Sequence, residues 1–372
     1  MQMKWYLNMM LFACLVLATG CSIAPDSAKQ PTVGTRTLPT ASILLTATPS
    51  PTVSVSASPT GTIKPTSTSA PTETASPTLT FTPEPYAGYR IDDLASRSYG
   101  GGELVVEGVM AENSYFTRYL ISYPSDGLRI YGFMNVPKKG APPYPVVIAL
   151  HGYIEPEIYN TLDYTTGYAD ALAREGYLVL HPNLRGYRPS DSGDNLFRVG
   201  MAVDVLNLIA LVKEQGGQPG PLAAANPGLI GLWGHSMGGG ISTRVVTVSP
   251  DVKAVVLYGA MSGDERQNFE RIFTYFSNGT RGLEELAVPE DALLTISPIY
   301  YLDRIQAAVS IHHGESDVDV PPPWSQDLCN RLIALGKSVE CFTYPGQPHT
   351  FHGEGNDLFN QRVVDFFNRT LR

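Results

Sequence analysis

The chain is 372 residues long and carries 26 lysines and arginines against 35 aspartates and glutamates, a formal net charge of −9. It contains no run of basic residues, so nucleic acid is excluded as an expected partner and the acidity is interpreted as an aid to solubility. The length would allow two ordinary domains, but the composition changes near residue 85 and limits a folded core to the residues after this point.

Residues 1–20 have the features of an export signal. Lys4 precedes an apolar run from Trp5 to Ala18, which is shorter than the ~20 residues of a transmembrane helix. Small residues then precede Cys21, as in a bacterial lipobox, although Leu17 lies one position away from the usual leucine. We expect cleavage before Cys21, lipidation of its thiol and an exported protein at the cell envelope or surface, with no other membrane contact. An ordinary secreted protein and an uncleaved anchor are the alternatives.

Residues 21–85 are rich in serine, threonine and proline and carry almost no charge. Such a segment buries too little apolar surface to offset the entropy lost on folding. Degenerate repeats such as Ser58-Pro59-Thr60 and Ser76-Pro77-Thr78 favour polyproline II, with about 3.1 Å per residue. We predict a disordered, semi-stiff spacer that holds the domain formed by residues 86–372 away from a membrane or through a wall layer.

Strand-like and helix-like segments alternate through residues 86–372. Strands are expected at residues 104–110, 115–123, 128–137, 144–150, 177–181, 229–233, 252–258, 307–312 and 339–344. Helices are expected at residues 161–175, 196–214, 241–248, 323–335 and 357–371, with a helical insertion at 261–297. This alternation predicts an α/β fold with a mostly parallel central sheet and helices on both faces.

Gly234-His235-Ser236-Met237-Gly238 lies between a predicted strand and a predicted helix. Glycines two positions before and after a serine are typical of a nucleophile elbow, a sharp turn that exposes the serine hydroxyl. A side chain at either glycine would collide where the turn folds back, and the serine is expected in a strained backbone conformation. We therefore predict Ser236 as a nucleophile, with the N-terminus of the next helix favouring developing negative charge.

Two loops after the elbow contain the partners that a serine hydroxyl needs for nucleophilic attack. One comes after a predicted strand and contains Asp317, and the other comes after the last predicted strand and contains His349. We predict His349 as the general base and Asp317 as the carboxylate that orients its imidazole. Asp319 is the alternative acid and His352 the alternative base.

A tetrahedral oxyanion needs two hydrogen-bond donors. The backbone N–H of Met237, at the start of the elbow helix, is the first candidate. The second is the N–H of Tyr153, directly after His151-Gly152 at the end of a predicted strand. An ordinary strand-ending turn is the alternative interpretation of His151-Gly152.

Four cysteines are present in the chain. Cys14 would leave with the signal and Cys21 would carry lipid, so Cys329 and Cys341 remain in the folded domain. They lie on a predicted helix and on the strand after it. An even pair in an exported domain indicates a disulfide, and two buried thiols are the alternative.

Six motifs succeed one another along residues 115–372. They are Tyr123-Pro124-Ser125-Asp126-Gly127-Leu128, His151-Gly152-Tyr153, Asn183-Leu184-Arg185-Gly186-Tyr187, Gly234-His235-Ser236-Met237-Gly238-Gly239, His313-Gly314-x-x-Asp317-x-x-Val320-Pro321 and Tyr344-Pro345-x-x-x-His349-x-Phe351. Together they resemble the catalytic domain of the prolyl oligopeptidase family, within the α/β-hydrolase superfamily, and dienelactone hydrolases are near relatives. The resemblance implies an α/β-hydrolase fold, a Ser-His-Asp triad and hydrolysis through a covalent acyl-enzyme, without a metal or organic cofactor.

Oligopeptidases of that family carry a β-propeller that screens substrates by size, whereas only the spacer precedes the hydrolase domain in this sequence. An open site suits esters as well as peptides. The resemblance still implies a peptidase-like serine hydrolase, and we expect a small-molecule or peptide substrate. A carboxylesterase of the dienelactone hydrolase-like group and a non-catalytic surface binding module are the alternatives. The aromatic residues of the insertion are expected to form a lid or pocket wall, or part of the core. Glu155, Glu157 and Arg185 are placed near the mouth of the site.

Overall fold

The computed structural model describes residues 85–372. The expected signal, the lipid-carrying Cys21 and nearly all of the expected spacer lie outside the described residues. Within the described part, no helix combines the length and the apolar character needed to cross a bilayer.

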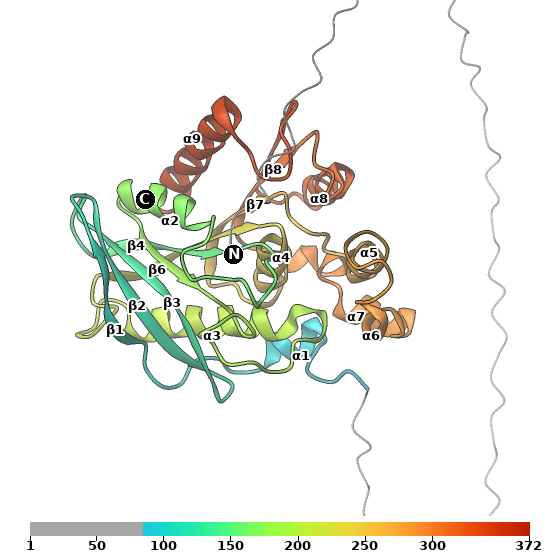
Figure 1. Ribbon diagram of the computed structural model, residues 1–372, viewed down its shortest axis with the longest axis horizontal. Coiled ribbons are helices and arrows are strands. Elements are labelled where there is room, and N and C mark those ends of the chain that lie inside the picture. The colour runs from blue at the N-terminus through green and yellow to red at the C-terminus, as the bar shows by residue number, and fades with distance from the viewer. Residues whose placement is uncertain (1–84) are drawn as a thin grey trace, which may run out of the picture. The chain divides into compact units, whose positions relative to one another are not determined.

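A nine-stranded sheet forms the centre of the described part, with strand order β1-β2-β3-β5-β4-β6-β7-β8-β9 (Figure 1). The sequence pattern predicts all nine strands, four of them with the observed bounds. The strands are β1 (Val105–Glu112), β2 (Phe116–Ser125), β3 (Leu128–Pro137), β4 (Tyr144–Leu150), β5 (Leu178–Pro182), β6 (Ala225–His235), β7 (Val252–Tyr258), β8 (Ala308–Gly314) and β9 (Val339–Tyr344).

The sheet is mostly parallel, as the sequence predicts. Strand β4 pairs in parallel with both β5 and β6, and parallel pairing continues through β7 and β8 to β9. β1, β2 and β3 add an antiparallel edge, because β3 pairs antiparallel with β5. The chain runs from β4 to β5 and then returns past β4 to β6. Such a reversal leaves a crevice at the carboxyl ends of the strands, where ligands bind in α/β proteins.

Helices cover both faces of this sheet, as predicted (Figure 1). On one face, α2 (Thr166–Arg174) and α9 (Gly353–Thr370) pack around a buried aromatic cluster that includes Trp233 and Phe359. The other face is covered by α1 (Ile91–Ser96), α3 (Val199–Gln215), α4 (Met237–Val248) and α8 (Pro322–Ala334). Apolar strands buried on both faces are required by a parallel sheet between two helical layers.

The expected helical insertion lies between β7 and β8. It consists of α5 (Glu265–Arg271), a π-helical turn (Ile272–Phe276), α6 (Leu283–Leu286) and α7 (Glu290–Ile296). The insertion joins the core through Phe269 and Leu293, which are 5% and 3% exposed. These two buried side chains therefore fix the position of the insertion against the core.

The helix expected at 161–175 begins only at Thr166. The preceding residues form turns instead, in which Asn160 N–H donates to Asp163 Oδ2 at 2.7 Å. Such side-chain contacts offer the backbone an alternative to helical hydrogen bonds, which is why the predicted helix began five residues too early. The helix ends before Gly176, whose φ of +93° suits glycine, as expected.

The helix expected at 196–214 is interrupted at its start. Leu196–Arg198 form a 3₁₀ turn, and α3 begins at Val199. Phe197 and Arg198 have φ of 54° and 57°, in the left-handed region that periodicity does not reveal. The helix α1 was not predicted, since six residues are too few to show a helical period.

Cys329 of α8 and Cys341 of β9 form a disulfide, with their Cα atoms 6.4 Å apart. This confirms the paired alternative over two free thiols. The bond fixes α8 to the strand that leads into the loop of His349.

Candidate active site

Ser236 lies between β6 and α4 with φ 55° and ψ −116°, a strained conformation for a residue other than glycine. A Cβ at Gly234 would lie 2.3 Å from Gly238 O, so the turn folds back on itself as predicted. At Gly238 the obstacle is different, because a Cβ there would lie 2.4 Å from Leu150 O at the end of β4. Met261 N–H donates to Ser236 O at 3.0 Å and helps to hold the strained peptide.

Asp317 and His349 meet although 32 residues separate them in the chain, with His349 Nδ1 2.7 Å from Asp317 Oδ2. The other carboxylate oxygen, Oδ1, accepts hydrogen bonds from the N–H groups of Asp319 and Val320, both at 2.9 Å. His313 Nε2 lies 3.1 Å from Oδ2. Burial opposes ionisation, but the hydrogen bonds from His313, His349 and the backbone outweigh it and lower the pKa of Asp317 well below its usual range. The carboxylate is therefore ionised at neutral pH.

The two alternative residues occupy other positions. Asp319 lines the same cavity as Ser236 and His349, but its backbone N–H supports the carboxylate of Asp317. His352 is exposed just before α9, where its N–H donates to Gln347 Oε1 at 2.9 Å. The structure thus brings Ser236, His349 and Asp317 to one region and pairs His349 with Asp317.

Gly259, directly after β7, leaves room for this pair. A Cβ at this position would lie 3.2 Å from His349 Nδ1 and 3.4 Å from Asp317 Oδ2, and the glycine has φ +48°. Both the space and the backbone conformation therefore favour glycine here. Sequence reasoning missed Gly259, because a single glycine after a strand is an ordinary turn signal.

Met237 and Tyr153, the two expected oxyanion donors, line the cavity together with Ser236. Met237 is the first residue of α4, so its N–H has no intrahelical acceptor. Across residues 85–372, no hydrogen bond occupies the N–H of Tyr153. Both donors are thus available beside the nucleophile. Their assignment to an oxyanion hole stays a prediction.

His235 connects the two sides of the site, which the sequence did not reveal. Tyr164 Oη accepts from Gly152 N–H at 2.8 Å and donates to His235 Nδ1 at 3.0 Å. His235 Nε2 then donates to His349 O at 3.0 Å. Burial, reinforced by the neighbouring His349, lowers the pKa of His235 to about 3 and keeps it neutral. One chain of hydrogen bonds thus joins the loop of Tyr153 to the loop of His349.

The site opens into a cavity of about 580 Å³. Its apolar lining includes the side chains of Met201, Met261, Phe269, Ile272, Phe276 and Trp324. Four of these lie within the insertion expected at 261–297, which therefore forms a wall of the cavity, as predicted. A concavity with a largely apolar surface beside a strained serine is typical of a substrate site.

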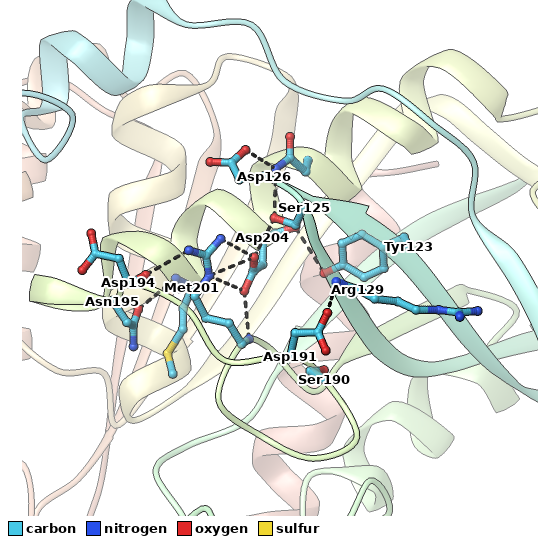
Figure 2. A network of polar contacts seen from close by, with 12 residues as sticks. Tyr123, Ser125, Asp126, Arg129, Ser190, Asp191, Asp194, Asn195, Met201 and Asp204 are labelled. Atoms are coloured by element: carbon cyan, nitrogen blue, oxygen red, sulfur yellow. Dashed lines mark hydrogen bonds and ion pairs between the residues drawn. The ribbon is translucent and has the colours of Figure 1, made fainter.

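Arg185 lines the cavity, but its guanidinium is bound by residues outside the cavity lining. Its Nη2 donates to Asp204 Oδ1 at 2.8 Å, its Nε contacts both oxygens of the same carboxylate at 3.1 Å, and its Nη1 donates to Asp194 O at 2.9 Å. Figure 2 shows the polar network around Asp204, which also accepts from Ser125 Oγ at 2.6 Å. These contacts hold the loop after β5 against α3. Arg185 is therefore a buried structural residue at the edge of the cavity.

Of the two glutamates expected near the mouth of the site, only Glu155 lines the cavity. Glu155 lines the cavity and forms an ion pair of 2.7 Å with Arg281 of the insertion, which also contacts Tyr153 Oη. Glu157 does not belong to the cavity lining. Glu155 therefore joins the loop after β4 to the insertion across the mouth of the cavity.

Asp317, Asp319 and His349 place ligand-type atoms within 4.8 Å of one another, as a metal site would. Both oxygens of Asp317 already accept hydrogen bonds, from His349 on one side and from backbone N–H groups on the other. Such contacts describe an imidazole oriented by a carboxylate.

Comparison with known proteins shows which family and which relatives this chain is similar to. Residues 145–291 match the family described as alpha/beta hydrolase fold. The uncharacterized peptidase YuxL of Bacillus subtilis is 23% identical over 287 residues, which cover 72% of this chain and 41% of YuxL. The uncharacterized peptidase YtmA of the same organism is 26% identical over 245 residues, which cover 64% of this chain and 88% of YtmA. The chain thus spans less than half of the first relative and most of the second.

Two solved structures are similar in fold. A puromycin-hydrolyzing peptidase of Mycobacterium tuberculosis has a TM-score of 0.56 and 19% identity, with 70% of this chain and 41% of that chain covered. Acetyl xylan esterase 1 of Thermoanaerobacterium has a TM-score of 0.53 and 19% identity, with 74% and 90% covered. Peptidases and esterases therefore share the architecture described here.

Proposed function

We propose that this member of the α/β-hydrolase superfamily is a serine hydrolase that acts through Ser236, His349 and Asp317. The observation that supports the proposal most is the 2.7 Å contact between His349 and Asp317, beside a cavity that is also lined by a serine in a strained elbow. Peptidases among the relatives and esterases among the similar folds agree with this class of enzyme.

In the proposed reaction, His349 Nε2 takes the proton of Ser236 Oγ as the oxygen attacks the substrate carbonyl. The N–H groups of Met237 and Tyr153 stabilise the oxyanion, and His349 then protonates the leaving group. Asp317 keeps the proton of His349 on Nδ1 and stabilises the imidazolium. Water cleaves the acyl-enzyme by the same steps in reverse, and Ser236 is regenerated.

Labelling with a fluorophosphonate probe tests this proposal against a non-catalytic surface binding module. We expect rapid labelling of the wild-type protein and none of Ser236→Ala, because the probe reacts with an activated serine. A folded wild-type protein that is not labelled would support the binding module, since a binding role does not require an activated hydroxyl.

A peptidase-like activity of the prolyl oligopeptidase type is the leading specificity, and a carboxylesterase of the dienelactone hydrolase-like group is the second candidate. The relatives with peptidase names favour the first, whereas the acetyl xylan esterase, covered over 90% of its length, favours the second. Relative kcat/KM for a peptide p-nitroanilide and a p-nitrophenyl ester separates the two. Turnover of the ester alone would contradict a peptidase.

The proposal includes an exported protein that is anchored by lipid on Cys21 and separated from the membrane by residues 21–85. The disulfide between Cys329 and Cys341 supports export, because such bonds persist in oxidising compartments. Incorporation of labelled palmitate into cells that produce the full chain measures the anchor. We expect incorporation to be lost in Cys21→Ala, and equal labelling of both proteins would exclude this anchor.

A further inference from the structure

We propose that Arg198 binds a carboxylate carried by the substrate, so that the enzyme prefers acidic substrates over neutral ones of the same size. The inference deepens the proposed function and rests on it, because Arg198 lines the same cavity as Ser236 and His349. Four features of Arg198 carry it: the backbone conformation, the partners of the guanidinium, the local charge and the apolar surroundings.

The backbone that carries Arg198 is strained. Phe197 and Arg198 both have left-handed φ values, 54° and 57°, which residues other than glycine rarely adopt. Phe197 is fully buried and packs edge-to-face against Phe269 of the insertion. Burial of Phe197 thus supports the strained turn, and the turn presents Arg198 to the cavity. Strain of this kind gathers at functional sites.

The guanidinium of Arg198 is held in place, but only some of its hydrogen-bond donors have an acceptor. It lies 4.7 Å from the ring centre of Phe269, and its Nη2 donates to Glu265 Oε2 at 2.7 Å. Its Nε and Nη1 donate to no group among residues 85–372. The side chain is 12% exposed. Donors that water reaches poorly are costly when unpaired, so a ligand oxygen in the cavity would stabilise them.

Arg198 shares its carboxylate partner with a second arginine. Glu265 is shared, because its Oε1 accepts from Arg244 at 2.5 Å while its Oε2 accepts from Arg198. Arg244 is 2% exposed and also donates to Ile296 O at 2.7 Å, so it is satisfied away from the cavity. Two guanidinium groups thus share one carboxylate, and Arg198 is the one of the two that lines the cavity. A fixed guanidinium with free donors matches a carboxylate.

The other arginines of the cavity wall have partners of their own. Arg185 is bound by Asp204, and Arg281 is paired with Glu155. Arg271 donates to the carbonyl oxygens of Val318 and Asp319. Asp319 itself faces the cavity near His349.

Glu285 is the acidic group that opposes the proposal. It lines the cavity and interacts electrostatically with Arg198, although the two form no ion pair. Burial raises the pKa of Glu285. Removing this carboxylate should therefore strengthen the binding of an anion at Arg198.

Apolar residues occupy much of the remaining wall, which includes Met201, Met261 and Ile272. They suit a short apolar chain between the carbonyl that Ser236 attacks and the carboxylate that Arg198 binds. The chemical class of the substrate is therefore an ester or amide of an acid that carries a second carboxylate.

Hydrolysis of p-nitrophenyl hemiesters by the full chain tests the inference. Succinate, glutarate and adipate hemiesters are each compared with the analogue whose free carboxylate is capped as an amide. We expect the wild type to prefer at least one hemiester by about tenfold to a hundredfold in kcat/KM, which is the effect of a charge-assisted hydrogen bond. In Arg198→Met, which retains a side chain to cover Phe269, this preference should fall to near one, mainly through KM.

Glu285→Gln should raise the preference, whereas Arg331→Met, a matched change of an exposed arginine paired with Asp327 on α8, should not alter it. A structural role of Arg198 would lower hydrolysis of the acidic and the capped substrates equally. Equal losses for both substrates in Arg198→Met would therefore overturn the proposal, as would a wild type without preference for any of the three hemiesters.

Binding of glutarate separates this inference from the proposed function. Isothermal titration of Ser236→Ala with glutarate requires no catalysis, and we expect binding that is lost when Arg198→Met is added. If neither fluorophosphonate labelling nor ester turnover occurs while glutarate binds, the proposed function is wrong and the carboxylate site stands. If esters are cleaved but glutarate does not bind, the carboxylate site is wrong.

Discussion

Asp317 is a buried carboxylate that stays charged because each of its oxygens accepts hydrogen bonds. Burial alone would raise its pKa, but contacts with His313, His349 and two backbone N–H groups reverse the effect. Asp319, two residues away, has no such set of donors among the described residues. The two neighbouring carboxylates therefore differ in the hydrogen-bond donors that surround them.

Asp317→Asn is expected to lower kcat by roughly 10⁴-fold, as loss of the acid does in other Ser-His-Asp enzymes, because an amide does not hold the required tautomer of His349. Asp319→Asn serves as the matched control and should change kcat far less. Ester hydrolysis at saturating substrate measures both variants. Equal losses in the two would mean that Asp317 has no special role.

Tyr164→Phe removes the hydroxyl that bonds both Gly152 and His235. We expect kcat to fall about tenfold, because the loops of Tyr153 and His349 lose a shared contact, and stability to fall by about 1–3 kcal/mol as buried groups lose partners. Urea unfolding and ester hydrolysis measure the two effects.

Tyr177→Phe is the control for that experiment, since its hydroxyl donates to Asn368 at 2.8 Å on the face covered by α9. It should lose stability without loss of kcat. If both variants lowered kcat in proportion to their stability, Tyr164 would have no role in positioning the site.

At the scale of elements, the elbow, the two candidate partners of Ser236 and Gly259 lie in loops at the carboxyl ends of four strands. The elbow lies after β6, Gly259 after β7, Asp317 after β8 and His349 after β9. Parallel strands bring these four positions to one edge of the sheet, and the insertion after β7 adds a wall of the cavity. Loops on a rigid sheet carry the chemistry because the strands fix their starting points.

The disulfide is expected to stabilise the element pair α8 and β9. Cys329 and Cys341 are 12 residues apart, and closing a loop of this length in the unfolded chain contributes about 3 kcal/mol in the chain-entropy model. The double variant Cys329→Ala, Cys341→Ala should therefore unfold at lower urea concentration.

Reductant provides the control for this prediction. It should lower the stability of the wild type and leave the double variant unchanged. A mass-spectrometric map of the oxidised protein should contain a peptide pair joined through Cys329 and Cys341. Free thiols at both positions in protein purified without reductant would contradict the prediction.

At the scale of the whole molecule, several histidines are buried in neutral form. Burial lowers the pKa of His181, His235 and His312 to about 3, well below the value of about 6.5 in an unfolded chain. The unfolded state therefore takes up protons below pH 6.5 that the folded state does not. Folding stability is fully present above this pH and is lost as the pH falls toward 3.

Urea unfolding between pH 7 and pH 5 should show this loss, with a slope of up to about 1.4 kcal/mol per pH unit for each such imidazole. The depressed pKa of Asp317 acts in the same direction at lower pH, since its carboxylate contacts are lost on protonation. A stability that does not vary over this range would show that these histidines are charged in the folded protein.

Much of the fold was predictable because the signals are local. Largely apolar runs mark the buried parallel strands β4 and β7, whose bounds match the expected ones, and the bounds of β3 and β9 match as well. The start of α3 was not predictable, since the left-handed turn at Arg198 depends on burial of Phe197 against Phe269, 72 positions along the chain.

The sequence by itself determined the α/β architecture, the elbow at Ser236 and the candidates Asp317 and His349, because strand, helix and turn preferences act over a few residues. Tertiary structure alone decided which carboxylate contacts His349 and which acceptors each arginine of the cavity wall binds. Asp204 of α3 forms an ion pair with Arg185, whereas Glu265 forms ion pairs with both Arg198 and Arg244. Such partnerships join residues from distant parts of the chain, and only the packing of the elements brings them within hydrogen-bonding distance.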